Sequence, residues 1–112
     1  MIKSKYKNKK IKVGDIEFDS KKEAARYQDL LLMQKAGLIR NLMWQQVFVI
    51  VPSVVLDGRK RPAIKYKADF TYFDDTRAGR FVVEDVKGFR TPIYRLKRHL
   101  MMAVHGFEVL ET

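Results

Sequence analysis

Cysteine is absent from this sequence of 112 residues. Its absence excludes disulfide scaffolds, zinc sites built on thiolates and cysteine nucleophiles. The two histidines, His99 and His105, are too isolated in the sequence to indicate a zinc site. A chain without thiols fits a reducing compartment, and we therefore expect a cytoplasmic location.

Long hydrophobic runs are also missing. The longest apolar stretch, from Val47 to Leu56, contains Pro52 and Ser53 and is too short to cross a bilayer. The first twelve residues are basic, but no apolar segment follows them, so we expect no secretory signal. The length predicts one domain, and we expect it not to span a membrane.

Acidic residues are scarce, since 13 Asp and Glu stand against 23 Lys and Arg, for a formal net charge of +10. Such a charge on a small domain implies an anionic partner, and nucleic acid is the first candidate. An acidic membrane surface or an acidic protein is the alternative, because net charge alone does not choose among them.

The basic residues gather in two places. Residues 1–10 are lysine-rich and aperiodic, which predicts a mobile arm that repels itself in the free protein. A second group lies in the helix expected near the C-terminus. Near DNA each such residue can replace a condensed counterion on the phosphates. The candidate DNA contacts are Lys3, Lys5, Lys7, Lys9, Lys10, Lys12, Arg95, Lys97 and Arg98.

Turn residues and hydrophobic periodicity predict the order of elements. We expect a hairpin over 10–18, a helix over 21–36, strands over 43–51, 63–73 and 81–87, a helix over 91–105 and a strand over 107–111. Short turns favour antiparallel pairing of the first three core strands, whereas the last returns through a helix and can pair in parallel. The predicted fold class is α/β (α+β): a small mixed β-sheet flanked by helices, with an N-terminal hairpin, in a single domain over 11–112.

The strand over 81–87, within the stretch FVVEDVKG, carries charges that a buried strand normally avoids. Because side chains alternate across a strand, Asp85 and Lys87 share one face and Glu84 points to the other. In the preceding strand, Asp69 is expected on the face opposite Tyr66, Ala68, Phe70 and Tyr72. If these strands pair, about 4.8 Å apart, Asp69 and Asp85 can approach each other.

Two carboxylates at that spacing repel each other unless a cation lies between them. Oxygen ligands without histidine or cysteine favour Mg²⁺ or Mn²⁺. A neighbouring lysine can orient a water molecule and stabilise charge on a phosphoryl group. The residues therefore indicate metal-assisted phosphodiester hydrolysis. The simpler interpretation of the same charges is a solvated strand edge with cross-strand ion pairs.

Asp69 in KADF, followed by Asp85-Val86-Lys87 in the next strand, resembles the PD-(D/E)xK nuclease superfamily. Over residues 11–110 the run FDSKKEAARY, WQQVF, KADF and VEDVKG looks like a small phage-associated family of endonucleases within it. Relatives of that family include Holliday-junction resolvases and transposon end-cleaving nucleases. The resemblance implies a restriction-endonuclease-like core and, for a phage-encoded protein, the cytoplasm of the bacterial host.

The resemblance also implies roles for individual residues. Asp69 and Asp85 would be metal ligands, with the backbone carbonyl of Val86 as a further ligand, and Lys87 would be the catalytic lysine. Glu23 would be the helix acid and a candidate metal ligand. It also lies three residues after Ser20, so a capping box is the alternative role for its side chain.

Three further positions stay open. Glu84 competes with Asp85 as the acid of the second motif, and we choose Asp85 because its spacing to Lys87 fits. Gln45 or Gln46 would line the site from the first core strand.

The sequence thus predicts a Mg²⁺- or Mn²⁺-dependent endodeoxyribonuclease, with branched or junction DNA as a candidate substrate. The alternative is a non-catalytic DNA-binding module or a phage packaging accessory protein on the same fold. A homodimer is a candidate assembly, because cutting both strands of a duplex requires two active sites.

Overall fold

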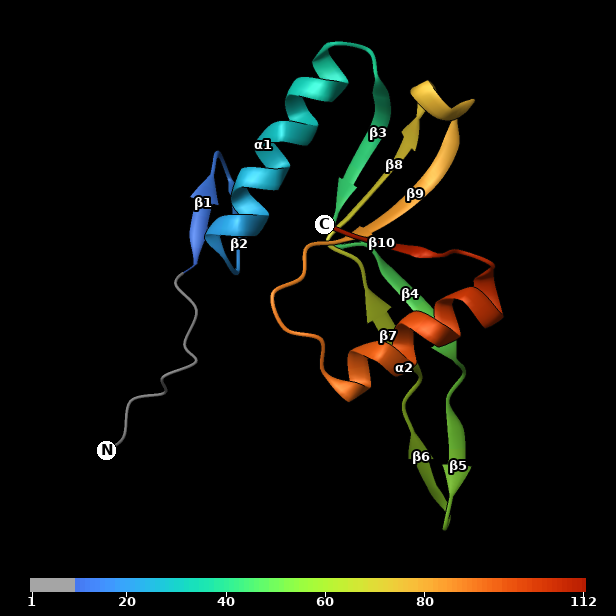
Figure 1. Ribbon diagram of the computed structural model, residues 1–112. Coiled ribbons are helices and arrows are strands. Elements are labelled where there is room, and N and C mark those ends of the chain that lie inside the picture. Colours follow the sequence, from blue (N-terminus) through green and yellow to red (C-terminus); the bar gives the residue numbers. More distant parts are fainter. Residues whose placement is uncertain (1–9) are drawn as a thin grey trace, which may run out of the picture.

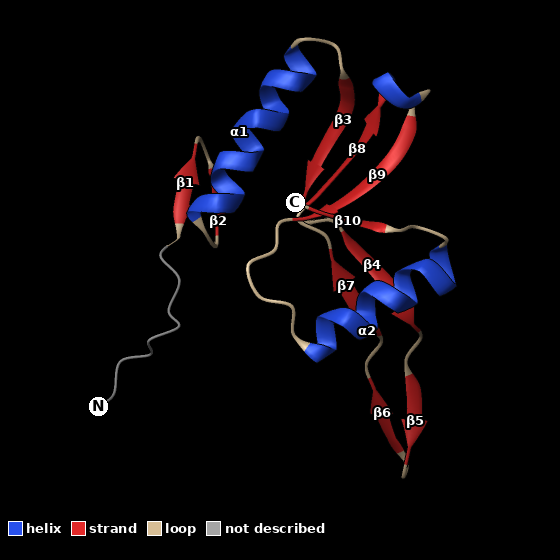
Figure 2. Cartoon of the chain, in the orientation of Figure 1, coloured by secondary structure: helices blue, strands red, loops and turns tan. Residues whose placement is uncertain are grey.

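The computed structural model describes residues 10–112 (Figures 1 and 2). In this part of the chain, helix α1 (Lys21–Lys35) and helix α2 (Pro92–Leu100) accompany ten strands. A 3-10 helix (Asp75–Arg77) follows β8, and a π-helical segment (Met101–His105) prolongs α2. The strands are β1 (Ile11–Val13), β2 (Ile16–Phe18), β3 (Ile39–Trp44), β4 (Val47–Val51), β5 (Val54–Leu56), β6 (Arg59–Arg61), β7 (Ile64–Lys67), β8 (Phe70–Asp74), β9 (Arg80–Asp85) and β10 (Val109–Glu111). The predicted mixed α and β fold class is confirmed.

Both helices begin where their capping residues predict. Ser20 Oγ accepts a hydrogen bond of 3.1 Å from the Glu23 amide at the start of α1. Thr91 Oγ1 accepts one of 3.1 Å from the Tyr94 amide, and Pro92 occupies the first turn of α2, where its missing N–H costs nothing. These side chains satisfy amide groups that have no partner inside the helix.

A four-stranded sheet in the order β10-β9-β8-β3 forms the centre of the fold. β8 pairs antiparallel with β3 and with β9, whereas β10 pairs parallel with β9. The mixed pairing was expected from the short turns and the helical return. The hairpin of β1 and β2 is also confirmed and contacts α1.

The prediction of single strands over 43–51 and 63–73 was wrong. The first strand begins earlier, at Ile39, and each of the two is interrupted once. As a result β3 pairs with β8, and β4 pairs with β7. Pairing nevertheless keeps one register across the break, since Trp44 pairs with Phe70 and Val47 with Lys67. The two long strands are therefore one β-ribbon with a local break.

The break has a backbone cause. Gln45 has a φ of 56°, a left-handed conformation that no regular strand accommodates. Its amide donates a hydrogen bond of 3.0 Å to the Asp69 carbonyl, and the Ala68 amide donates one of 2.9 Å to the Gln46 carbonyl. Opposite the left-handed residue, the other strand bends at Asp69.

The bend also corrects the prediction that Tyr66, Ala68, Phe70 and Tyr72 share one face. Tyr66 and Ala68 belong to the core under α2, together with Val83, Tyr94, Met101 and Val109. Phe70 and Tyr72 belong to the other core, against α1, together with Phe18, Tyr27, Leu30 and Val86. Strict alternation fails because the bend carries the strand from one layer to the other.

No helix of residues 10–112 is both long and apolar enough to cross a membrane. The predicted basic arm includes Lys3, Lys5, Lys7 and Lys9, which lie outside the described residues.

Candidate active site

The bend at Asp69 and the end of β9 bring two acidic side chains into one pocket of about 300 Å³. Its lining contains Glu23, Tyr66, Lys67, Asp69, Asp85, Val86, Lys87, Thr91, Ile93, Tyr94 and Lys97. Four residues that the sequence predicted as catalytic, Glu23, Asp69, Asp85 and Lys87, thus share one surface. They come from α1, the ribbon break and the end of β9.

Asp69 is held against the backbone that follows β9. Its Oδ2 accepts a hydrogen bond of 2.7 Å from the amide of Val86. Burial raises the pKa of Asp69 to about 8, and the hydrogen bond and charge of the Asp85 carboxyl act in the same direction. The Val86 amide opposes this shift. Burial and the neighbouring Asp85 therefore both disfavour the charged form of Asp69, and a bound cation would favour it.

Asp85 is buried and has a partner at each oxygen. The hydroxyl of Tyr66 donates a short hydrogen bond to its Oδ2, and the ammonium of Lys87 lies 2.9 Å from its Oδ1. Tyr66 itself has a raised pKa, first because it is buried and then because it bonds to Asp85, so it stays a hydrogen-bond donor. The two partners fix the orientation of the carboxylate.

Lys87 follows β9 and reaches back over the pocket. Its ammonium lies 3.8 Å from the centre of the Tyr94 ring, an arrangement that favours the cation. The side chain keeps 20% of its surface exposed, so it is open to a ligand in the pocket. Its carbonyl accepts a hydrogen bond of 2.7 Å from Lys22 of α1, which ties the loop after β9 to the helix.

Glu23 lies half-buried in the first turn of α1 and lines the same pocket. Burial raises its pKa, and the charges of Asp19 and Asp85 add to the rise, whereas hydrogen bonds to Ser20 and to the Asp19 backbone lower it. The helix acid and the strand acid thus line one pocket. The backbone amide of Glu23 also donates to Ser20 in the helix cap, and the role of its side chain stays a prediction.

Glu84 lies on the other side of β9, fully buried. Arg26 of α1 binds its two carboxylate oxygens at 2.7 and 2.9 Å. Tyr72 donates a hydrogen bond of 2.7 Å to the same carboxylate, and Thr112 donates one of 3.2 Å. Every acceptor direction of Glu84 is thus used inside the protein, and it does not line the pocket.

The two glutamines do not line the pocket either. Gln46 Oε1 accepts a hydrogen bond of 2.6 Å from buried Thr71, and Gln45 Nε2 approaches the Glu17 carbonyl at 3.4 Å. Their structural contribution is the ribbon break that positions Asp69.

The basic residues chosen as DNA contacts fall into three groups. Lys97 lines the acidic pocket, and Arg95 lies exposed on the same helix. Arg98 donates two hydrogen bonds, of 3.1 and 2.9 Å, to the Val109 carbonyl and therefore holds α2 against β10. Lys10 pairs with Glu17 at 3.4 Å, and Lys12 is exposed on β1.

Sequence reasoning missed Tyr66, Lys67, Tyr94 and Arg26. Tyr66 was expected on the face opposite Asp69, and only the bend places it beside Asp85. Tyr94 and Arg26 carried no sequence signal for their partners, since each contacts a residue outside its own helix. Lys67 lies two residues before Asp69, so strand alternation places both side chains on one face. The sequence therefore did contain a signal for Lys67.

The pocket contains donors that suit one kind of metal. Among residues 10–112, no group of three or more His, Cys, Asp or Glu side chains has the arrangement of a metal centre. Two carboxylates, Asp69 and Asp85, remain. Mg²⁺ commonly binds through one or two carboxylates and keeps several waters, so this donor set fits it. Only the N–H contact of Val86 is defined, so its carbonyl stays a predicted ligand.

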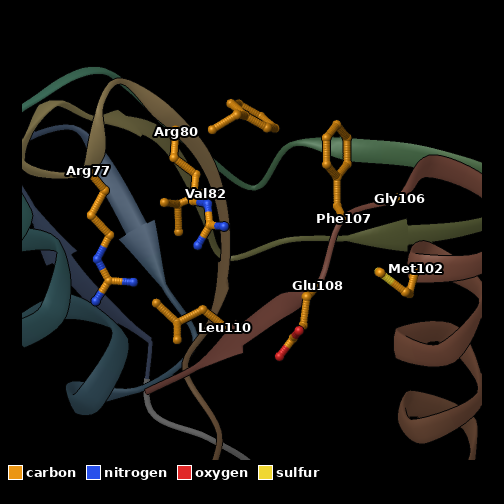
Figure 3. A pocket seen from close by; sticks show the side chains of 9 residues that line it. Arg77, Arg80, Val82, Met102, Gly106, Phe107, Glu108 and Leu110 are labelled. Carbon is orange, nitrogen blue, oxygen red and sulfur yellow. The ribbon is translucent and has the colours of Figure 1, made fainter.

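A second pocket also contains two carboxylates, Glu108 and Glu111, but Arg90 and Tyr94 already donate to Glu111. A further pocket lacks a carboxylate pair. This pocket, drawn in Figure 3, lies along the start of β9 and the segment before β10. Its polar lining is Arg77, Arg80 and Glu108, among apolar groups such as Leu110 and Met102. It has one carboxylate and no pair.

Fold and site together define a small mixed α and β domain with a pocket lined by three acids and three lysines. The chain belongs to DUF1064, a family described as proteins of unknown function, whose profile matches residues 3–109. Neither a curated protein nor a solved structure matches the chain.

Proposed function

We propose that this protein is a divalent-metal-dependent endodeoxyribonuclease of the PD-(D/E)xK type, acting in the cytoplasm. One observation carries the proposal: Asp69, Asp85 and Lys87, which are separated in the sequence, lie in a single open pocket. The net charge of +10 supports a polyanionic substrate. The raised pKa of Asp69 supports the proposal, because a bound cation would stabilise the charged form of this carboxylate.

Asp69 and Asp85 would hold Mg²⁺ or Mn²⁺, which when bound polarises a phosphoryl oxygen and acidifies a coordinated water. The remaining steps belong to the chain itself. Tyr66 and the Val86 amide orient the two carboxylates through their hydrogen bonds. Lys87 donates to the attacking water or to the phosphoryl oxygens, where negative charge builds up. Glu23 adds an acceptor that can orient the water.

Hydrolysis consumes one water molecule for each cut. The water oxygen forms a new bond to phosphorus and one phosphorus–ester oxygen bond breaks. A proton lost by the water neutralises the departing oxygen. Lys97 and Lys67, which line the pocket, supply positive charge for the phosphates on either side of the scissile bond.

Branched or junction DNA is a candidate substrate of this proposal, because the relatives named by the resemblance include junction resolvases. A homodimer would supply two pockets for two cuts. The mass of the protein in solution, measured with and without DNA, tests the dimer.

The function is tested by incubating the folded protein with linear, nicked and branched DNA in Mg²⁺, in Mn²⁺ and in EDTA. We expect cuts with either metal and none in EDTA. Asp69→Ala, Asp85→Ala and Lys87→Ala should each bind DNA and fail to cut it. Wild-type protein that binds DNA but cuts none of these substrates would instead support the non-catalytic DNA-binding alternative.

A further inference from the structure

The hairpin of β5 and β6 extends away from the rest of the molecule (Figures 1 and 2). All six residues of its two strands are exposed. Its turn consists of Asp57 and Gly58, both with positive φ (50° and 71°), which is the tight two-residue turn that matches the twist of a ribbon. The protein thus keeps an ordered projection that contributes nothing to either core.

The ribbon that ends in this hairpin is strongly basic. Between Val47 and Lys67 the only acidic residue is Asp57, and the basic residues are Arg59, Lys60, Arg61, Lys65 and Lys67. Arg59 pairs across the hairpin with Leu56, and Arg61 with Val54. One face of the hairpin therefore presents two arginines and two aliphatic side chains, and the other presents Lys60 and Val55.

The same ribbon leads to the acidic pocket. Lys67 lines that pocket, and Arg59 lies eight residues before it, beside the hairpin turn. At roughly 3.3 Å per strand residue this distance is about 26 Å. One strand of a duplex places about eight phosphates along such a length, at about 3.4 Å each.

We propose that the β5–β6 hairpin binds duplex DNA next to the cleavage site, with the ribbon in the wide groove and its arginines on the phosphates. A two-stranded ribbon fits the major groove, which is about 12 Å wide, and its valine and leucine side chains suit the thymine methyl groups. A second copy of this chain is the less favourable occupant, because two identical hairpins would bring their arginines together. The choice of DNA as partner rests on the proposed function.

The test compares two double variants of the full chain. Arg59→Gln/Arg61→Gln removes two arginines from the hairpin. Arg77→Gln/Arg80→Gln removes two exposed arginines, one from the 3-10 helix and one from the start of β9, and is the matched control. Binding to a linear duplex is measured in EDTA, from about 50 to 200 mM salt, after melting curves have shown that both variants are folded.

We expect the log–log salt slope of the hairpin variant to be shallower than that of wild type by about two units, since each lost phosphate contact removes about 0.9. The control should keep the wild-type slope within about half a unit. Equal slopes for the two variants would overturn the proposal. A further double variant, Val55→Ser/Leu56→Ser, tests the hairpin as a dimer contact. If it converted a dimer to a monomer and left the salt slope of DNA binding unchanged, the proposal would also be overturned.

Failure of the hairpin and failure of the nuclease give different results. Wild type that binds duplex through the hairpin but cuts nothing in Mg²⁺ or Mn²⁺ refutes the nuclease and retains the hairpin. If wild type cuts DNA and the hairpin variant binds DNA like the control, the nuclease is retained and the hairpin proposal is refuted. Wild type without affinity for duplex refutes the hairpin proposal directly.

Discussion

Glu84 and Asp85 are neighbours on β9, yet their carboxylates lie in opposite environments. Glu84 points toward α1 and is fully buried, with Arg26, Tyr72 and Thr112 as its partners. Asp85 points toward the pocket, beside Lys87 and the second carboxylate of Asp69. The first acid is ion-paired with Arg26 inside the protein, whereas in the pair on the other side Lys87 forms an ion pair with Asp85 alone.

The two environments determine which carboxylate is available to a metal or a substrate. A carboxylate whose lone pairs are all used by the protein has nothing left to offer a metal or a substrate. A pair of carboxylates that destabilise each other binds a cation readily, since the cation relieves their repulsion. Of the two adjacent acids on β9, Glu84 thus has a structural role, and Asp85 is the acid that the proposed function can use.

Cleavage should show the largest contrast between the two acids. Asp85→Asn and Asp69→Asn should each lower the rate of DNA cutting by on the order of a hundredfold or more, because each removes a charged metal ligand. Glu84→Gln should retain most of the rate when assayed well below its melting temperature. Single-turnover cutting with saturating protein provides the measurement. If Glu84→Gln were the inactive variant, the assignment of the two faces would be reversed.

Stability should show the opposite contrast. Arg26→Gln leaves the buried Glu84 carboxylate without its cation and should cost about 3 kcal/mol of unfolding free energy. Glu84→Gln should cost less, because the Arg26 side chain keeps 26% of its surface exposed and can bind water. Denaturant unfolding in EDTA measures both. Equal costs for the two variants would show that solvent does not reach Arg26.

Variants of Glu23 and Ser20 distinguish a role of Glu23 in the pocket from a role in the helix cap. Glu23→Gln should slow cutting strongly at a nearly unchanged melting temperature, since it removes charge from a crowded acidic pocket. Ser20→Ala is the matched cap variant and should lose about 1 kcal/mol of stability with little loss of rate. Normal turnover in Glu23→Gln, together with a lower melting temperature, would leave Glu23 as a capping residue alone.

A last expected effect is a pH dependence of stability without metal. The pKa of Asp69 is about 8 in the folded protein, against an ordinary value of 3.8. Folding therefore favours the protonated acid, and the stability that it contributes below about pH 4 is lost as the pH rises toward 8. In EDTA, Asp69→Asn should gain melting temperature relative to wild type between pH 5 and 9. Parallel melting curves across this range would mean that Asp69 ionises normally.

Several features followed from local sequence alone. Ser20 and Thr91 start the two helices, and Gly14-Asp15 turns the N-terminal hairpin, because these residues satisfy or shape the backbone within a few positions. The alternation of β9 placed Glu84 and Asp85 on opposite faces, since that strand is regular up to Asp85. The mixed sheet followed from the lengths of the connections between strands.

Other features required the folded chain. The left-handed conformation of Gln45 and the bend at Asp69 depend on cross-strand hydrogen bonds between distant residues. No local pattern in the sequence predicts this conformation or this bend. For this reason the faces predicted around Tyr66 and Phe70 were wrong.

The sequence by itself determined the composition of the candidate site: an acid on a helix, an acid in a ribbon, and an acid and a lysine around the end of a strand, in a basic chain. Tertiary structure decided which acids meet. The ribbon break carries Asp69 into the pocket, and α1 provides Arg26 for Glu84, because burial of a charge is tolerated only where the fold brings it a partner.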